Sequence, residues 1–118
     1  MWLITENGFA SVVAHRDKED VLLVRARSRG DLEAFCRIAG EEGIGALDPD
    51  SIWEDPSADY RWRIEAGQAA VADLARVLVE RIDYDNFKLR VGLHDPGREG
   101  VYHEVWRELS KIEQPDRG

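Results

Sequence analysis

The sequence predicts an α+β protein, in which helices pack on one face of an antiparallel sheet of four or five strands, in a ferredoxin-like or related layout. Three observations support this fold class. Residues 60–65 alternate apolar and charged side chains, the period of a strand with one buried face. Residues 32–39 and 68–82 repeat apolar side chains at helical spacing. Most strand-like runs precede the helical ones, as in α+β rather than alternating α/β proteins.

Three strands are predicted in the N-terminal part of the chain. Residues 2–5 and 9–14 are β-prone, and Asn7-Gly8 between them is a strong hairpin signal because both turn positions favour positive φ. Residues 15–20 form a polar turn, and residues 21–27 follow as the third strand. One face of that strand carries Leu22, Val24 and Ala26, and the other carries Val21, Leu23, Arg25 and Arg27. A short edge strand is predicted at Ile52-Trp53, within an acidic loop over residues 41–57.

Helices are predicted from apolar stripes and capping residues. Ser28 or Asp31 can cap a first helix, whose apolar face is Leu32, Phe35, Cys36 and Ala39. A second helix ends near residue 82, and its stripe is Val71, Leu74, Ala75, Leu78 and Ile82. Asp83 or Asp85 is predicted to cap a short piece that reaches residue 91. Residues 92–100 are predicted as a loop, and a last helix spans residues 99–113.

Length and composition favour one compact protein that folds without disulfide cross-links. The 118 residues correspond to one ordinary domain, expected over residues 1–113, with residues 114–118 as a disordered tail. A single cysteine excludes an internal disulfide and favours a reducing compartment. The first residues have no signal-peptide pattern, and no apolar run is long enough for a membrane span. We therefore expect a cytoplasmic protein that does not enter a membrane.

The net charge of −8 comes from 24 acidic and 16 basic residues. Such a charge favours solubility and makes non-specific binding to nucleic acid unlikely. A local basic patch remains possible. Its position is the main clue to a partner.

Several segments together resemble a family of small proteins from actinobacteria and their phages. The segments are residues 1–5 with Gly8-Phe9, residues 15–17, residues 22–27, residues 59–63, residues 82–88, and Tyr102-His103 with Val105-Trp106. Nearly the whole chain takes part, and residues 82–88 are the most specific segment. The resemblance implies a cytoplasmic protein of a bacterium or phage and implies nothing about chemistry.

Arginines are placed where an outward sheet face is expected. If Tyr60, Trp62 and Ile64 face the helices, Arg61 and Arg63 point to the other side, as do Arg25 and Arg27 on the third strand. Were these strands neighbours, four guanidinium groups would share one face and could bind phosphate or carboxylate. The alternatives are pairing with Glu65, Glu19 or Asp31 across strands, or a dimer contact. Val21 and Leu23 lie in the same row and favour a protein interface.

Other candidate sites have weaker patterns. Tyr84, Asp85 and Asn86 could line a pocket with Tyr102 and His103, although capping and interhelix packing are the favoured explanation. His15 with Asp17 and Ser11 is not by itself a catalytic triad, because a triad is a geometry. His103 and Glu99 have helical ligand spacing but no further ligand, and Gly43-Ile44-Gly45 is not a dinucleotide loop. We therefore expect no catalytic residues, no metal and no cofactor.

Three functions remain open at this stage. The leading hypothesis is a non-enzymatic binding or regulatory protein that recognises a protein partner, which includes a second copy of itself, or an anionic ligand. The second is a phage anti-defence inhibitor of the anti-CRISPR kind, whose carboxylates mimic nucleic acid and would form a stripe. The third is a small hydrolase or nuclease, in which His15 or His103 would converge with other groups in a pocket.

Overall fold

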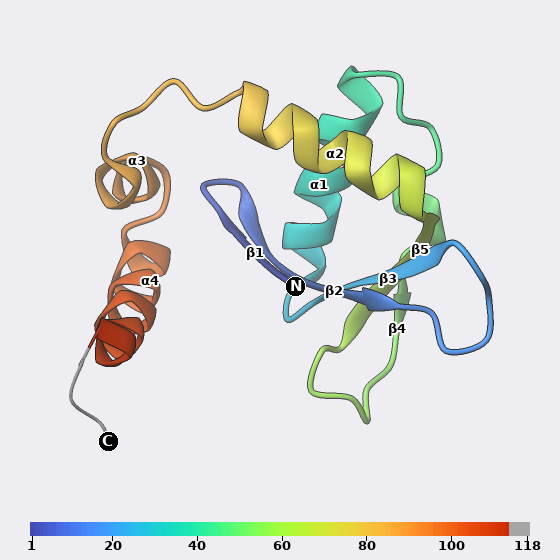
Figure 1. The fold of residues 1–118 in the computed structure, drawn as a ribbon, viewed down its shortest axis with the longest axis horizontal. Coiled ribbons are helices and arrows are strands. Elements are labelled where there is room, and N and C mark those ends of the chain that lie inside the picture. Colours follow the sequence, from blue (N-terminus) through green and yellow to red (C-terminus); the bar gives the residue numbers. More distant parts are fainter. Residues whose placement is uncertain (114–118) are drawn as a thin grey trace. The chain divides into compact units, whose positions relative to one another are not determined.

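The computed structural model describes residues 1–113. The chain forms two compact units, Met1–Ile82 and a second that begins at Asp83. The first contains a five-stranded antiparallel sheet with the order β1-β2-β3-β5-β4 (Figure 1). Its strands are β1 (Trp2–Thr5), β2 (Gly8–Ala14), β3 (Val21–Ala26), β4 (Trp53–Glu54) and β5 (Trp62–Gly67). The predicted α+β class is confirmed. The single domain expected over residues 1–113 stays a prediction, and residues 114–118 lie outside the described part.

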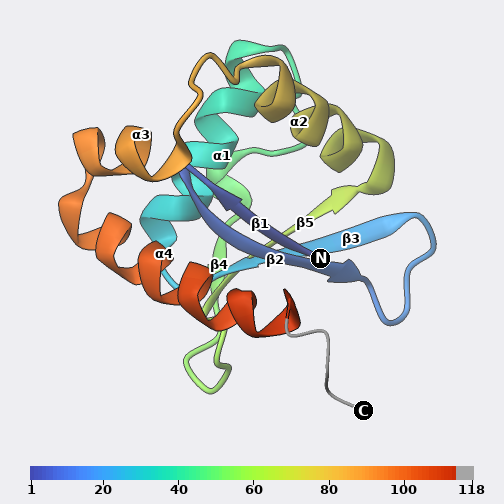
Figure 2. The ribbon, with the colours of Figure 1, turned by 60° about the vertical axis from the view of Figure 1, so that its left-hand side comes forward.

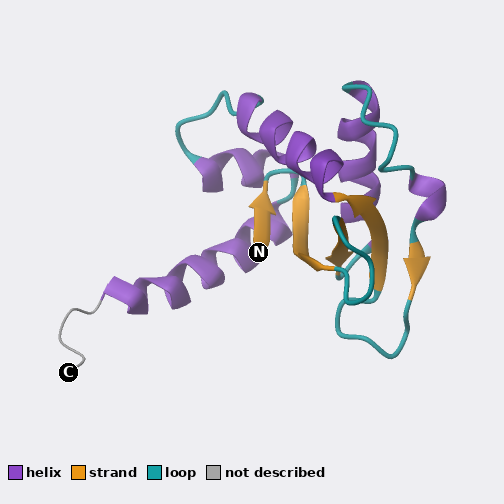
Figure 3. Cartoon of the chain, turned by 45° about the vertical axis from the view of Figure 1, so that its right-hand side comes forward, coloured by secondary structure: helices purple, strands orange, loops and turns teal. Residues whose placement is uncertain are grey.

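Two helices of the first unit, α1 (Arg29–Glu41) and α2 (Gln68–Glu80), pack against the same face of the sheet (Figure 2). A 3₁₀ turn, η1 (Pro49–Ser51), leads into the edge strand β4 (Figure 3). The run β3-α1-β4-β5-α2 reproduces the first five elements of the β-α-β-β-α-β layout. Within the described residues no strand follows α2, and β2 occupies the position beside β3. The arrangement is thus related to the ferredoxin-like layout.

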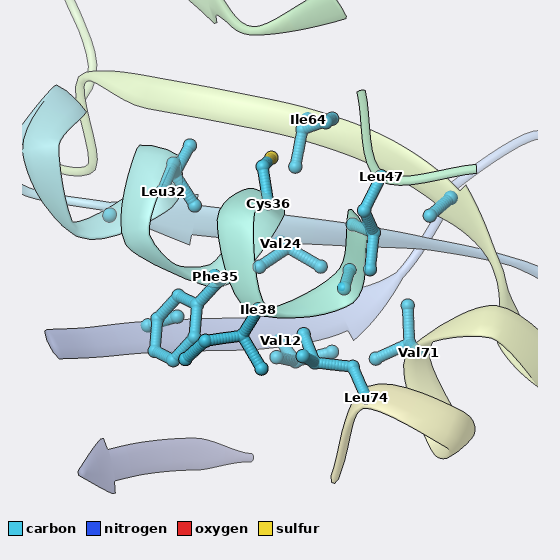
Figure 4. Packing of buried hydrophobic residues seen from close by; sticks show 14 of the residues in the cluster. Val12, Val24, Leu32, Phe35, Cys36, Ile38, Leu47, Ile64, Val71 and Leu74 are labelled. Carbon is cyan, nitrogen blue, oxygen red and sulfur yellow. The ribbon is translucent and has the colours of Figure 1, made fainter. Parts of the chain in front are cut away.

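The core lies between this sheet face and the two helices. Alternate residues of the central strands are buried there, as the two-residue period requires; they are Ala10, Val12, Val24, Ala26, Ile64 and Ala66. The predicted face of α1 is buried, and Val71, Leu74 and Val77 of α2 pack opposite it (Figure 4). Cys36 lies within this cluster, and its burial raises the pKa of the thiol to about 11. The thiol is therefore a small core side chain rather than a nucleophile.

The hairpin between β1 and β2 turns one residue earlier than predicted. Its two turn residues are Glu6 and Asn7, and Gly8 is already the first residue of β2. The Thr5 hydroxyl accepts hydrogen bonds from the N–H groups of Asn7 and Gly8, both at 3.1 Å. This side-chain turn replaces the expected Asn-Gly turn, since Asn7 does not have positive φ.

Tyr60 does not face the helices, and the prediction that it does is wrong. β5 begins only at Trp62, because the chain bends through residues 58–60 and the Asp59 carboxylate accepts a hydrogen bond from the N–H of Tyr60. The alternation seen in the sequence therefore holds for Trp62 and Ile64 but not two residues earlier. The Tyr60 ring lies instead 6.2 Å from the ring of Phe9.

The second unit is a helical hairpin of α3 (Phe87–His94) and α4 (Pro96–Leu109), extended by the 3₁₀ turn η2 (Ser110–Glu113). Asn86 caps α3, rather than Asp83 or Asp85, by accepting a hydrogen bond from the N–H of Leu89 at 3.0 Å. The loop predicted over residues 92–100 is wrong. Asp95 ends α3 and caps α4 at once, and Pro96 occupies the first turn, where its missing N–H costs nothing.

Candidate binding surface

The face of the sheet opposite α1 and α2 is the candidate site, and we call it the outer face. No helix of the first unit packs on it. Its side chains are the strand residues that alternate with those of the core: Trp2, Ile4, Phe9, Ser11, Val13, Val21, Leu23, Arg25, Trp53, Arg63 and Glu65. An antiparallel register places directly opposite residues on the same side, so the pairing alone defines this surface.

One row crosses all five strands of the outer face. In strand order it is Trp2, Ser11, Arg25, Arg63 and Trp53. Trp2 is 60% exposed and Trp53 is 39% exposed. The two arginines are direct cross-strand partners in the middle of the row. Like charges placed opposite each other destabilise a sheet, so this pair is a cost to the fold.

Neighbouring groups hold the Arg25 guanidinium in place. Its Nη2 donates a hydrogen bond to the Ser11 hydroxyl at 2.7 Å, and its Cζ lies 4.7 Å from the centre of the Tyr60 ring. The Nε of Arg25 is buried and has no hydrogen-bond partner among the described residues. A buried donor without an acceptor costs free energy. Arg25 is thus fixed in position yet incompletely satisfied.

Arg27 and Arg63 surround the same tyrosine. The Cζ of Arg27 lies 4.9 Å from the ring centre of Tyr60, and Arg63 Nε donates to the Tyr60 carbonyl oxygen at 3.2 Å. Tyr60 is only 7% exposed. A cation over an aromatic ring gains about 0.5–2 kcal/mol, which partly offsets the crowding of positive charge. Tyr60 therefore organises the three arginines.

Carboxylates do not neutralise this group. Within the part of the chain that the structure describes, none of Arg25, Arg27 and Arg63 forms an ion pair. Arg63 does act electrostatically on one carboxylate, that of Asp55. The pKa of Asp55 is lowered chiefly by hydrogen bonds from Ser57 and to a smaller extent by Arg63.

Arg61, the fourth predicted member, behaves differently. It lies before β5, and its Nε is 3.2 Å from a Glu54 carboxylate oxygen. The interpretation of four arginines sharing one face thus applies to Arg25 and Arg63 directly and to Arg27 at the end of β3. Tyr60, Trp2, Trp53 and Ser11 were not recognised as members, because only the strand register shows that they share this surface.

Glu65, one predicted cross-strand partner of the arginines, is engaged elsewhere. Its two oxygens lie 2.8 Å from Lys18 Nζ and 3.1 Å from His15 Nε2. His15 Nδ1 accepts the N–H groups of Asp17 and Lys18, both at 3.0 Å, so its proton resides on Nε2. Nδ1 of His15 is thus bonded to the turn and Nε2 to Glu65 of β5, whereas Ser11 is bonded to Arg25. Ser11, His15 and Asp17 do not form a triad.

The Glu65 cluster should give stability a measurable pH dependence. Lys18 is the main cause that lowers the pKa of Glu65 below its ordinary value of 4.5, with His15 contributing less. A carboxyl whose pKa is depressed by folding adds stability above its unfolded pKa, and this stability is lost as pH falls through the folded pKa. In urea titrations from neutral pH to below 4.5, Glu65→Gln and Lys18→Gln should both show a shallower acid loss than the wild type. Parallel curves for all three proteins would contradict the assignment.

The outer face also contains the two aliphatic residues predicted for a protein interface. Leu23 pairs with Val13 on one side and with Glu65 on the other, and Val21 lies opposite Gly67. Both are half-buried. Val21 also lines an open pocket of about 290 Å³, together with the turn that joins β2 and β3. On one side of its arginine row, the outer face therefore carries the aliphatic residues Val13, Leu23 and Val21 next to Glu65.

Most of the residues predicted to line a pocket in the second unit instead cap a helix or pack against other aromatic rings. The Phe87 ring stacks on Tyr102 at 5.8 Å and contacts Tyr84 at 6.1 Å, so it lies between the two tyrosines. Asn86 caps α3, and Asp85 is exposed. His103 stacks on Trp106, and its Nδ1 is 3.4 Å from Lys88 Nζ. These contacts correspond to the capping and packing alternative for Asn86, Tyr84 and Tyr102.

No group of three or more His, Cys, Asp or Glu side chains within residues 1–113 is arranged to hold a metal ion. Searches of family models, curated proteins and solved structures found no match to this chain. Among the helices of the described part, none has the length and apolar character needed to cross a membrane.

Proposed function

We propose that this protein is a non-enzymatic binding module that holds an anionic group of its partner on the outer face. One observation carries the proposal: Arg25 and Arg63 are direct cross-strand neighbours without ion-pair partners among residues 1–113, in a chain of net charge −8. Folding alone favours acid–base pairs at such positions. An arrangement that costs stability is typical of a site maintained for binding. Guanidinium groups bind carboxylate or phosphate with two parallel hydrogen bonds.

The two alternatives have less support in the described residues. A nucleic-acid mimic needs a continuous stripe of carboxylates, whereas many acids here pair with arginine or lysine: Glu41 and Glu42 with Arg81, Glu54 with Arg61, Glu80 with Arg76, Asp83 with Arg90, and Glu108 with Lys111. A hydrolase needs a base with an accessible lone pair. The lone pair of His15 accepts two backbone N–H groups, and that of His103 faces Lys88.

Thermal shift with simple anions tests the proposal. Citrate and tripolyphosphate present clustered carboxylates and phosphates, and a ligand that binds the folded state raises the melting temperature. For Arg25→Gln/Arg63→Gln, we expect half-saturation to need at least about tenfold more anion, because each removed charge contact is worth about a kcal/mol or more.

The matched control is Arg37→Gln/Arg76→Gln. It removes the same charge from exposed positions on α1 and α2, in the helical layer opposite the outer face. Wild-type anion dependence is expected for this control. Equal shifts for both double variants would mean that the anions respond to net charge only, and the proposal would fail.

A further inference from the structure

We infer that the anionic group is a carboxylate on a segment of a different protein, whose apolar side chains pack beside the arginine row; this rests on the binding role proposed above. The first reason is the composition around the arginines. Phe9 and Val13 lie on β2, Leu23 lies on β3, and Trp2 and Trp53 stand at the ends of the row. Trp, Tyr and Arg are the residues that dominate the energetics of protein interfaces, and here they surround a central charge pair.

The second reason is the extent and sign of the charge. A groove for single-stranded nucleic acid follows the backbone with a series of positive side chains. The next row of the outer face, by contrast, is Val13, Leu23 and Glu65. The net charge of −8 also repels a long polyanion. A protein segment with one or two carboxylates matches a positive centre of this size without meeting that repulsion.

The third reason is that the arginines are already positioned. Ser11 and Tyr60 hold Arg25, and the Tyr60 carbonyl oxygen holds Arg63. Fixed guanidinium forks lose little conformational entropy when a carboxylate binds with two hydrogen bonds.

The charge pattern also disfavours a symmetric contact with a second copy. A two-fold axis through the middle of the row would place Arg25 and Arg63 against the same arginines of the other copy.

Selection from two random pools tests the inference with the full chain. A displayed library of random dodecapeptides and a pool of random single-stranded DNA are each selected on the wild-type protein, and the enriched ligands are then titrated against the wild type and both double variants. We expect enriched peptides that combine Asp or Glu with aromatic or aliphatic residues. Each should bind Arg25→Gln/Arg63→Gln at least about tenfold more weakly in titrations followed by tryptophan fluorescence. Arg37→Gln/Arg76→Gln should bind these peptides as the wild type does.

The remaining outcomes separate this inference from the binding role. If DNA is enriched in an arginine-dependent manner and peptides are not, the partner class is wrong, whereas the anion-binding face stands. If the enriched peptides lack acidic residues or bind all variants equally, the arginines are not the contact, and both proposals fail. Concentration-dependent self-association of the wild type that the double variant loses would identify a second copy as the occupant and overturn the inference.

Discussion

Replacing Phe35 by alanine is expected to lower the free energy of unfolding by about 3–5 kcal/mol. Phe35 is 1% exposed and is the largest of the fully buried side chains in the described residues. It projects from α1 into the cluster that joins the helices to the sheet (Figure 4). Truncation removes the ring from an apolar environment and leaves a cavity that the surrounding strands cannot fill completely. Domains of this size are stable by about 5–15 kcal/mol, so a measurable unfolded fraction is expected.

Urea denaturation followed by circular dichroism measures this loss. Phe35→Leu keeps most of the apolar volume and should cost less than half as much. Val79→Ala on α2 is the exposed control, because Val79 is 66% exposed and its truncation should change stability by less than about 0.5 kcal/mol. A loss for Phe35→Ala no greater than that for Val79→Ala would show that α1 does not dock on the sheet as described.

The core of the first unit was predictable because its buried residues recur at regular intervals along the sequence. Leu32, Phe35, Cys36 and Ala39 fall at helical spacing, and all four are buried. The alternation in β3 likewise placed Val24 inward and Arg25 outward correctly. Burial of one face of an element is a strong constraint, and it leaves a repeating signal in the sequence.

The errors arose where a local hydrogen bond replaces the repeating pattern. The Asp59 carboxylate bends the chain before β5, which moves Tyr60 to the outer face. The Thr5 hydroxyl shifts the hairpin turn by one residue. Asp95 followed by Pro96 is a cap followed by a first-turn proline, a signal that could have identified the start of α4.

The candidate site was only partly predictable for a different reason. Alternation indicates which side of a strand a residue occupies, but only the register indicates which residues stand next to each other. The pairing of β3 with β5 brings Arg25 opposite Arg63, and the pairing of β1 with β2 adds Trp2 to the same row. No pattern within a single strand carries that information.

Gly8→Ala is expected to cost about 2–4 kcal/mol, because Gly8 lies against a buried carboxylate. A Cβ at this position would be 2.9 Å from Asp31 Cγ and 3.0 Å from Asp31 Cβ. Asp31 is 8% exposed, and its Oδ2 accepts a hydrogen bond from the N–H of Phe9 at 2.9 Å. To make room, the carboxylate must move and leave that buried N–H without its acceptor. The φ of +158° at Gly8 adds strain for any residue with a side chain.

A double-mutant cycle with Asp31→Ala separates the steric contact from the backbone strain. Asp31→Ala alone should cost at least about 1–3 kcal/mol, since the N–H of Phe9 loses its acceptor. Asp31→Ala removes the contacts with Cγ and Oδ1 but keeps the Cβ at 3.0 Å, so it relieves only part of the steric cost of alanine at position 8. The double variant should therefore lose less stability than the sum of the single losses, by about 1 kcal/mol. It should still be less stable than Asp31→Ala, because the strained φ remains. Strict additivity in urea denaturation would instead mean that contact with the Asp31 carboxylate contributes nothing to the cost of Gly8→Ala.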